Sequence, residues 1–156
     1  MKKQYKLGVI GGGFMAQAIL KGAVYSEFIR PKKIIVSDPS REALDSLKYL
    51  GVNTSVNNRD VAENSEFVLF AVKPQNFDAA AESIHGLPVE TVISIMAGVT
   101  RKSIRDHLLG KNCRVARAMP NLPCSIGSGM TAIDLTDYAD DVDASAFINS
   151  VFGNLG

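Results

Sequence analysis

Three consecutive glycines, Gly11–Gly13, separate an apolar segment from a stretch with helical spacing. Residues 5–10 predict a buried strand, and the apolar positions after the glycines predict a helix. The pattern Gly11-x-Gly13-x-x-Ala16 is typical of a turn that approaches the pyrophosphate of a dinucleotide, where the helix start attracts anions. Gly11 permits the tight turn, Gly13 leaves out a Cβ that would block the phosphates, and Ala16 lets the helix pack closely. A glycine turn that only joins a strand to a helix is the alternative, which this order of elements disfavours.

Composition limits the classes of protein that this chain can represent. Its 156 residues are 46% hydrophobic and 21% charged, enough for one domain with a core. The net charge of +1 gives no reason to expect a nucleic acid or a membrane surface as partner. Residues 7–24 are too rich in glycine and alanine for a signal peptide or a membrane span. Cys113 and Cys124 match no metal-site spacing, so we expect reduced thiols, no metal and a cytoplasmic protein.

Strand and helix patterns alternate along the rest of the chain. This rhythm predicts an α/β fold: a single Rossmann-type domain over residues 1–156, doubly wound, with a mostly parallel sheet and helices on both faces. Further strands are expected at 33–37, 52–56, 66–72, 91–95, 114–118 and 130–133. Further helices are expected from Ser40 to the stop at Gly51, at 58–64 and 76–85, from Thr100 to the stop at Gly110, and at 140–152. The last residues, 153–156, follow a helix where another strand would come, which suggests a domain boundary.

Residues after the second strand bear on the choice of nucleotide. Asp38 lies 25 residues after Gly13, where an acidic side chain commonly binds the ribose 2′-hydroxyl of NAD. Ser40 and Arg41 follow at once, and a hydroxyl with a guanidinium suits the 2′-phosphate of NADP. The alternative is that Asp38 and Ser40 only cap the following helix.

Further candidates come at the carboxyl ends of later strands, where ligands of open parallel sheets bind. Ala71–Pro74 places Lys73 directly after a strongly apolar strand, and Met96–Gly98 puts small residues after the next one. The segment Arg117–Pro123 follows another strand as a proline-fixed loop. A surface lysine, a turn glycine and a structural loop are the alternatives for these segments. His85 and His107 have no partners at catalytic spacing.

Together these segments resemble one family. Ile10–Ala16, Phe70–Pro74, Ser94–Val99 and Arg117–Pro123 look like the N-terminal domain of pyrroline-5-carboxylate reductase, in matching order and over essentially the whole chain. The resemblance implies a domain that binds NADPH or NADH for hydride transfer to the C=N bond of 1-pyrroline-5-carboxylate, giving L-proline in proline biosynthesis. NADP is favoured because the family commonly uses it, and NAD stays open.

The resemblance and the residue patterns together give a set of expected cofactor-binding positions. Phe14, Met15, Ser37 and Asn58 enter on the resemblance alone, and the resemblance also places Asn121 near the reacting ring. The full set is Ile10, Gly11, Gly12, Gly13, Phe14, Met15, Ser37, Asp38, Ser40, Arg41, Asn58, Ala71, Val72, Lys73, Pro74, Met96, Ala97, Gly98 and Asn121.

Two departures from the family stand out. Phe14 occupies a position where the family often has a small polar residue. In the family a helical C-terminal domain with a Gly-Ser-Gly-Pro-Ala motif forms the dimer and supplies the imino-acid pocket and the proton-donating hydroxyl, and nothing in this chain matches it. The catalytic residues are therefore expected in that domain. The full-length protein is expected to be a homo-oligomer, and this chain alone is expected to be inactive.

Two other functions stay open. A coenzyme F420-dependent NADP oxidoreductase or a β-hydroxyacid dehydrogenase would begin with a similar glycine turn, although Val72–Pro74 and Met119–Asn121 argue against them. A stand-alone nucleotide-binding regulatory module is the other alternative.

Overall fold

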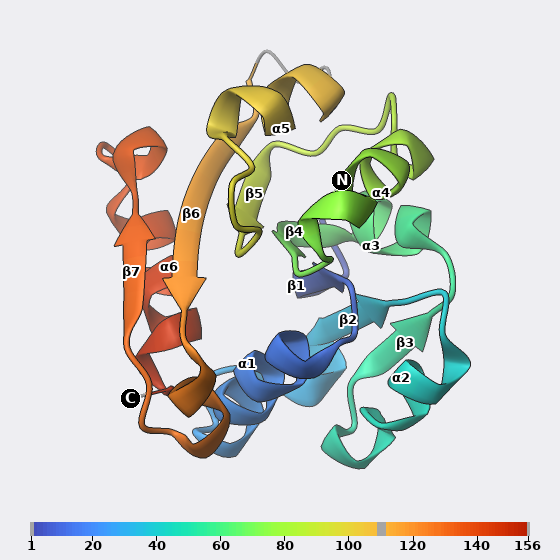
Figure 1. Ribbon diagram of the computed structural model, residues 1–156, viewed down its shortest axis with the longest axis vertical. Helices are drawn as coiled ribbons and strands as arrows, with labels where there is room; N and C mark the ends of the chain where they lie inside the picture. The colour runs from blue at the N-terminus through green and yellow to red at the C-terminus, as the bar shows by residue number, and fades with distance from the viewer. Residues whose placement is uncertain (1, 109–111, 156) are drawn as a thin grey trace.

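The computed structural model describes residues 2–108 and 112–155, without the side chains of Leu122 and Cys124. These residues form one seven-stranded sheet in the order β3-β2-β1-β4-β5-β6-β7 (Figure 1). All neighbouring strands are parallel except β7, which runs antiparallel to β6. The strands are β1 (Tyr5–Ile10), β2 (Ile34–Ser37), β3 (Asn53–Ser55), β4 (Ser65–Phe70), β5 (Thr91–Ser94), β6 (Arg114–Pro120) and β7 (Thr131–Asp134).

Helices cover both faces of this sheet. One hydrophobic cluster joins the sheet to α1 (Phe14–Tyr25), to the residues after α2 (Arg41–Asp45) and to α6 (Val142–Gly153). The second cluster joins the opposite face to α3 (Asn58–Asn64), α4 (Phe77–Ser83) and α5 (Arg101–Leu108). The expected Rossmann-type, doubly wound fold is confirmed.

Alternating side chains explain why the buried part of each central strand is apolar at consecutive positions. In β1, Leu7 and Val9 enter the first cluster, whereas Ile10 enters the second. Phe67 and Phe70 of β4 divide in the same way. A strand that is buried on both faces needs apolar residues at every position, which is the pattern of parallel sheets.

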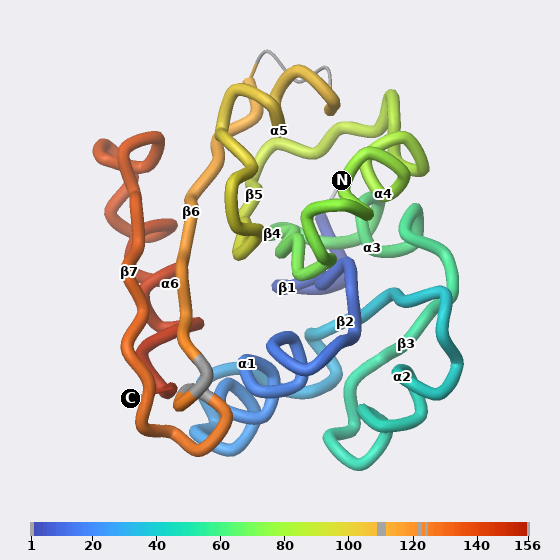
Figure 2. Tube along the Cα trace, viewed as in Figure 1, coloured from blue at the N-terminus to red at the C-terminus, as the bar shows by residue number. Residues whose placement is uncertain are grey.

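The chain path brings the glycine turn to the middle of the sheet. Figure 2 follows the chain from β1 outward to β3, then back across β1 to β4 and on to β7 at the opposite edge. The strand order therefore reverses between β1 and β4. Ligands of open α/β sheets bind outside the carboxyl ends of the strands at such a reversal.

Several element boundaries differ from the expected ones. β4 ends at Phe70 because the next residues leave the sheet toward Pro74, and β6 continues to Pro120 because β7 pairs with it. The expected helix from Ser40 is shorter: α2 ends at Asp45 and a separate 3₁₀ turn, Lys48–Leu50, leads to Gly51. The expected stop at Gly110 lies outside the described residues.

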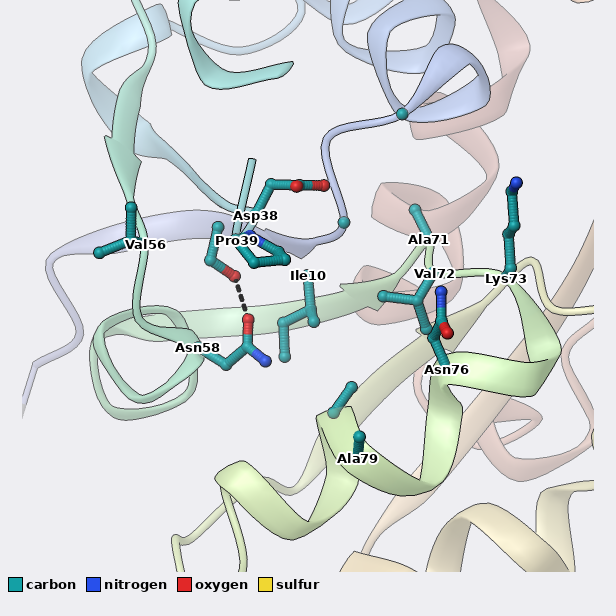
Figure 3. A pocket seen from close by; sticks show the side chains of 14 residues that line it. Ile10, Asp38, Pro39, Val56, Asn58, Ala71, Val72, Lys73, Asn76 and Ala79 are labelled. Carbon is teal, nitrogen blue, oxygen red and sulfur yellow. Dashed lines mark hydrogen bonds between the residues drawn. The ribbon is translucent and has the colours of Figure 1, made fainter. Parts of the chain in front are cut away.

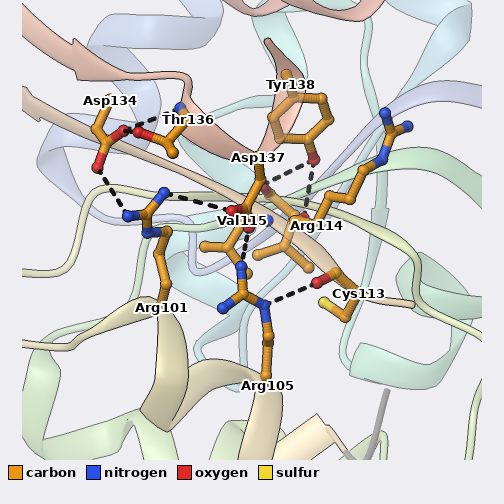
Figure 4. A network of polar contacts seen from close by, with 10 residues as sticks. Arg101, Arg105, Cys113, Arg114, Val115, Asp134, Thr136, Asp137 and Tyr138 are labelled. Carbon is orange, nitrogen blue, oxygen red and sulfur yellow. Dashed lines mark hydrogen bonds and ion pairs between the residues drawn. The ribbon is translucent and has the colours of Figure 1, made fainter. Parts of the chain in front are cut away.

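A partly buried carboxylate ties the β7 edge to the rest of the domain (Figure 4). Asp137 accepts a hydrogen bond from the Val115 backbone N–H at 2.9 Å and pairs with the guanidinium groups of Arg101 and Arg105. The adjacent Tyr138 is fully buried and donates its hydroxyl to the Arg114 carbonyl at 2.8 Å. These contacts join the segment after β7 to β6 and α5.

Replacing Asp137 by Asn should lower the free energy of unfolding by about 2–3 kcal/mol, because the charge that two arginines share is lost. Urea denaturation measures the change. Asp140→Asn is the matched control: Asp140 is exposed, so its replacement should change stability by less than about 0.5 kcal/mol. Equal midpoints for the two variants would contradict this role of Asp137.

Candidate functional site

The glycine turn is held between the carboxyl ends of two strands. The Gly11 N–H donates to the Ser37 carbonyl of β2 at 2.8 Å, and the Ala71 N–H donates to the Ile10 carbonyl at 2.8 Å. Gly11 has a φ of +104°, and a Cβ there would lie 2.8 Å from the Ala71 backbone. Only glycine fits this position, on conformational and on steric grounds.

Gly13, in contrast to Gly11, has free space where a side chain would be. Apart from its chain neighbours, no atom of the described residues lies within 4 Å of the position of a Cβ on Gly13, which precedes α1 and is exposed. No side chain caps the first turn of α1. Its backbone N–H groups therefore suit an anion, and the open space above Gly13 suits a pyrophosphate close to the backbone.

A pocket of about 530 Å³ extends from this turn along the carboxyl ends of β1, β2 and β4 (Figure 3). Its size is in the range of small-molecule and cofactor sites. The expected positions that line it are Ile10, Gly11, Gly13, Ser37, Asp38, Asn58, Ala71, Val72 and Lys73.

The Asp38 carboxylate makes its hydrogen bonds with nearby backbone. Oδ2 accepts from the Gly12 N–H at 2.8 Å and Oδ1 accepts from the Ser40 N–H at 2.8 Å. The Ser40 hydroxyl in turn accepts from the Ala43 N–H at 3.2 Å, so Ser40 caps α2. Arg41, the first residue of α2, is exposed, and no carboxylate pairs with it in the described part of the chain. Asp38 thus lines the pocket while it holds two loops.

A polar chain crosses the pocket floor beside Asp38. The buried Ser37 hydroxyl donates to Asn58 Oδ1 at 2.7 Å (Figure 3). Asn58 Nδ2 in turn donates to the Ser83 hydroxyl at 3.0 Å. This chain links β2, α3 and α4. It fixes the orientation of the Asn58 amide at the pocket wall.

The remaining expected positions lie outside this pocket. The Met96 side chain is buried in the second cluster, so Met96 can reach a ligand through its backbone alone. Ala97 and Gly98 are exposed beyond β5, and Asn121 Oδ1 accepts from the Met130 N–H at 3.0 Å beyond β6. Phe14 is 63% exposed at the start of α1. Gly12, Met15, Ser40, Arg41 and Pro74 also do not line the pocket.

Five lining residues were not among the expected ones. Pro39 and Val56 follow β2 and β3, Asn76 directly precedes α4, and Ala79 and Ala80 lie within α4. An available signal was that Val56 follows a strand end, as Asp38 does. Nothing in the residue pattern of α4 shows that this helix forms one wall of the pocket.

The described residues contain neither a group of metal ligands nor a membrane-spanning helix. Within residues 2–108 and 112–155 no group of histidine, cysteine and acidic side chains could hold a metal ion. None of the helices described there is long and apolar enough to cross a membrane. Burial raises the pKa of the Cys113 thiol to about 11, so this thiol stays protonated near neutral pH. The Cys124 side chain lies outside the described residues.

Comparison with known proteins identifies the family of this domain. A family model described as "NADP oxidoreductase coenzyme F420-dependent" matches residues 6–98, from β1 past β5. The chain belongs to this family. The match includes all the strands and helices that form the pocket.

Pyrroline-5-carboxylate reductases are among the curated proteins that are similar to this chain. The chain is 38% identical over 157 aligned residues to the enzyme from Synechocystis, covering 97% of this chain and 56% of that protein. It is 36% identical to pyrroline-5-carboxylate reductase 3 of Xenopus laevis, covering 90% of this chain and 52% of that protein. The chain thus spans about half the length of the curated relatives that it matches.

Solved structures agree. A pyrroline-5-carboxylate reductase from Coxiella burnetii has a TM-score of 0.86 at 33% identity, covering 98% of this chain and 57% of that chain. A pyrroline carboxylate reductase from Plasmodium falciparum with NADP bound has a TM-score of 0.77 at 22% identity, with 100% and 57% coverage, which shows the fold alone. The expected resemblance to the N-terminal part of pyrroline-5-carboxylate reductases is confirmed.

Substitutions at Gly11 and Gly13 should separate the effects of the turn on folding and on nucleotide binding. Gly13→Ala should keep or slightly raise the free energy of unfolding, because φ is −77° and the space is free. It should weaken nicotinamide dinucleotide binding about tenfold or more, or by about 1.4 kcal/mol. Gly11→Ala should instead destabilise the fold by about 2 kcal/mol or more. Denaturation and calorimetry measure the two effects, and destabilisation by Gly13→Ala would contradict the assignment.

Proposed function

We propose that this chain is the dinucleotide-binding part of a pyrroline-5-carboxylate reductase, which reduces 1-pyrroline-5-carboxylate to L-proline with a nicotinamide cofactor. The similarity to reductases of this activity over 97% and 90% of the chain is the observation that carries the proposal. The bound cofactor would supply a hydride to the carbon of the substrate C=N bond.

The residues of this chain would bind and orient that cofactor. The turn at Gly11–Gly13 and the first N–H groups of α1 would hold the pyrophosphate. Ser37, Asp38 and Asn58 would face the adenosine ribose from one side of the pocket, and Ala71–Lys73 would line the other, with Pro74 just outside it. Met96–Gly98 and Asn121 would lie toward the nicotinamide, beyond β5 and β6.

We favour NADP over NAD as the cofactor. The family description names an NADP oxidoreductase. Two N–H groups bind the Asp38 carboxylate, which offsets part of its repulsion of a 2′-phosphate, and the exposed Arg41 can provide an opposing charge. A ribose 2′-hydroxyl could still donate to Asp38, because a carboxylate has more acceptor sites than these two bonds use.

The other groups needed for turnover are proposed to lie outside these residues. We place the imino-acid pocket, the proton donor and the dimer contacts of a homo-oligomer in the part of the relatives that this chain does not span. Residues 1–156 would then be one dinucleotide-binding domain of a cytoplasmic enzyme, inactive without that part.

One observation favours a second function. The family description names coenzyme F420, which would make the substrate a deazaflavin rather than an imino acid. That match ends at residue 98, however, whereas the similarity to pyrroline-5-carboxylate reductases continues through β6 and β7.

Calorimetry with NADPH and NADH tests the binding proposal on the chain as it stands, and absence of binding by both would contradict it. The full-length gene product is then assayed with NADPH and either 1-pyrroline-5-carboxylate or oxidised F420. If the protein reduced F420 but not 1-pyrroline-5-carboxylate, the proposed substrate would be wrong.

The substitution Arg41→Ala tests whether Arg41 gives the domain a preference for NADPH over NADH. Loss of one charge-assisted contact to a 2′-phosphate predicts that the Kd for NADPH rises about tenfold. The Kd for NADH should change less than about twofold, since NADH lacks this phosphate. Arg59→Ala, at another exposed arginine, is the control for a loss of general positive charge. An equal loss for NADPH and NADH would show that Arg41 does not contact the phosphate.

A further inference from the structure

Gly12, the middle glycine of the turn, is held by two side chains from different elements. Asp38 Oδ2 accepts from the Gly12 N–H at 2.8 Å, and Gln17 Nε2 donates to the Gly12 carbonyl at 3.0 Å. Asp38 comes directly after β2, and Gln17 lies in the first turns of α1. We propose that Gln17 is a positioning residue for dinucleotide binding, which acts through the Gly12 carbonyl; this rests on the proposed nucleotide-binding function.

The two bonds fix the two peptide units on either side of the Gly12 Cα. The Gly12 N–H belongs to the unit shared with Gly11, and the Gly12 carbonyl belongs to the unit shared with Gly13. In a planar trans peptide the carbonyl and the next N–H point in opposite directions, and the described residues contain no cis peptide. The Gly13 N–H therefore points away from the Gln17 amide. Gly13 is exposed and lines the pocket.

Gly12 needs side-chain partners more than its neighbours do. Gly11 is fixed by the backbone bond to Ser37, and the Gly13 carbonyl accepts the first helical bond, from the Gln17 N–H at 3.0 Å. Glycine has wide conformational freedom, so an unrestrained Gly12 would let the following N–H groups turn away from a phosphate. Holding it before the ligand arrives removes an ordering cost from binding.

Gln17→Met is the test variant. Methionine has a similar length and helix propensity but no amide donor. Gln4→Met makes the same exchange at an exposed position at the start of the chain, beside β1 and far from its carboxyl end, and serves as the matched control. Hydrogen exchange of the ligand-free protein and calorimetry with NADPH, NADH and adenosine are compared for wild type and both variants, at a temperature where all are folded.

In Gln17→Met, we expect faster exchange confined to peptides that contain residues 11–16, and a Kd for both dinucleotides that is about three- to tenfold higher. Adenosine has no phosphate, so its affinity should not change. A purely structural role of Gln17 would instead speed exchange over the whole of α1 and β1, or leave the Kd values unchanged, and either result would overturn the proposal.

The two proposals fail in different ways. Wild-type protein that binds neither NADPH nor NADH contradicts the proposed function, while the exchange measurement still shows whether Gln17 holds the turn. Wild-type binding with an unaltered Gln17→Met variant contradicts only the positioning role. Gln4→Met should match wild type in every measurement.

Discussion

The close approach of Gly11 to Ala71 is the constraint on which the site depends. The backbone of the turn lies between β2 and β4, hydrogen-bonded to Ser37 on one side and touching the Ala71 backbone on the other. Because β1 lies between these two strands in the sheet, the turn emerges where the strand order reverses. A side chain at position 11 would separate β1 from the segment that follows β4. The pocket, its floor and the direction of α1 follow from this one contact.

Asp38 shows how the fold and the site share a residue. At this position the sequence indicates either a ribose ligand or a helix cap, and the carboxylate bonds the Gly12 and Ser40 N–H groups while it lines the pocket. A ligand that attracts or repels Asp38 therefore also acts on the glycine turn. The hydrogen bond between Asp38 and Gly12 joins the pocket wall after β2 to the glycine turn.

The parts of the fold that the sequence predicts well are those with a local cause. The glycines, the apolar run of β4 and the capping Ser40 each determine their element through nearby residues, and the structure has these elements at the expected places. The end of β6 was placed too early because its pairing with β7 joins residues that are distant in sequence.

The candidate site is less predictable for the same reason. Residues of the turn and of the strand ends could be named from the order of strands, since the carboxyl ends of parallel strands meet at one edge. Ala79 and Ala80 could not, because their place in the wall depends on how α4 packs on the sheet. Met96 lies two residues after β5 with its side chain in the core, which the residue pattern does not show, so Met96 can lie beside a cofactor only through its backbone.

The three glycines differ in what requires them. Position 11 requires glycine for the fold itself, because of its positive φ and the adjacent Ala71 backbone. Position 12 is held by Asp38 and Gln17, so the surroundings restrict a residue that would otherwise be free. Position 13 has ordinary backbone angles and empty space where a side chain would be, so nothing in the fold explains its lack of one. A ligand that occupies that space does explain it, which makes Gly13 the clearest mark of function in the turn.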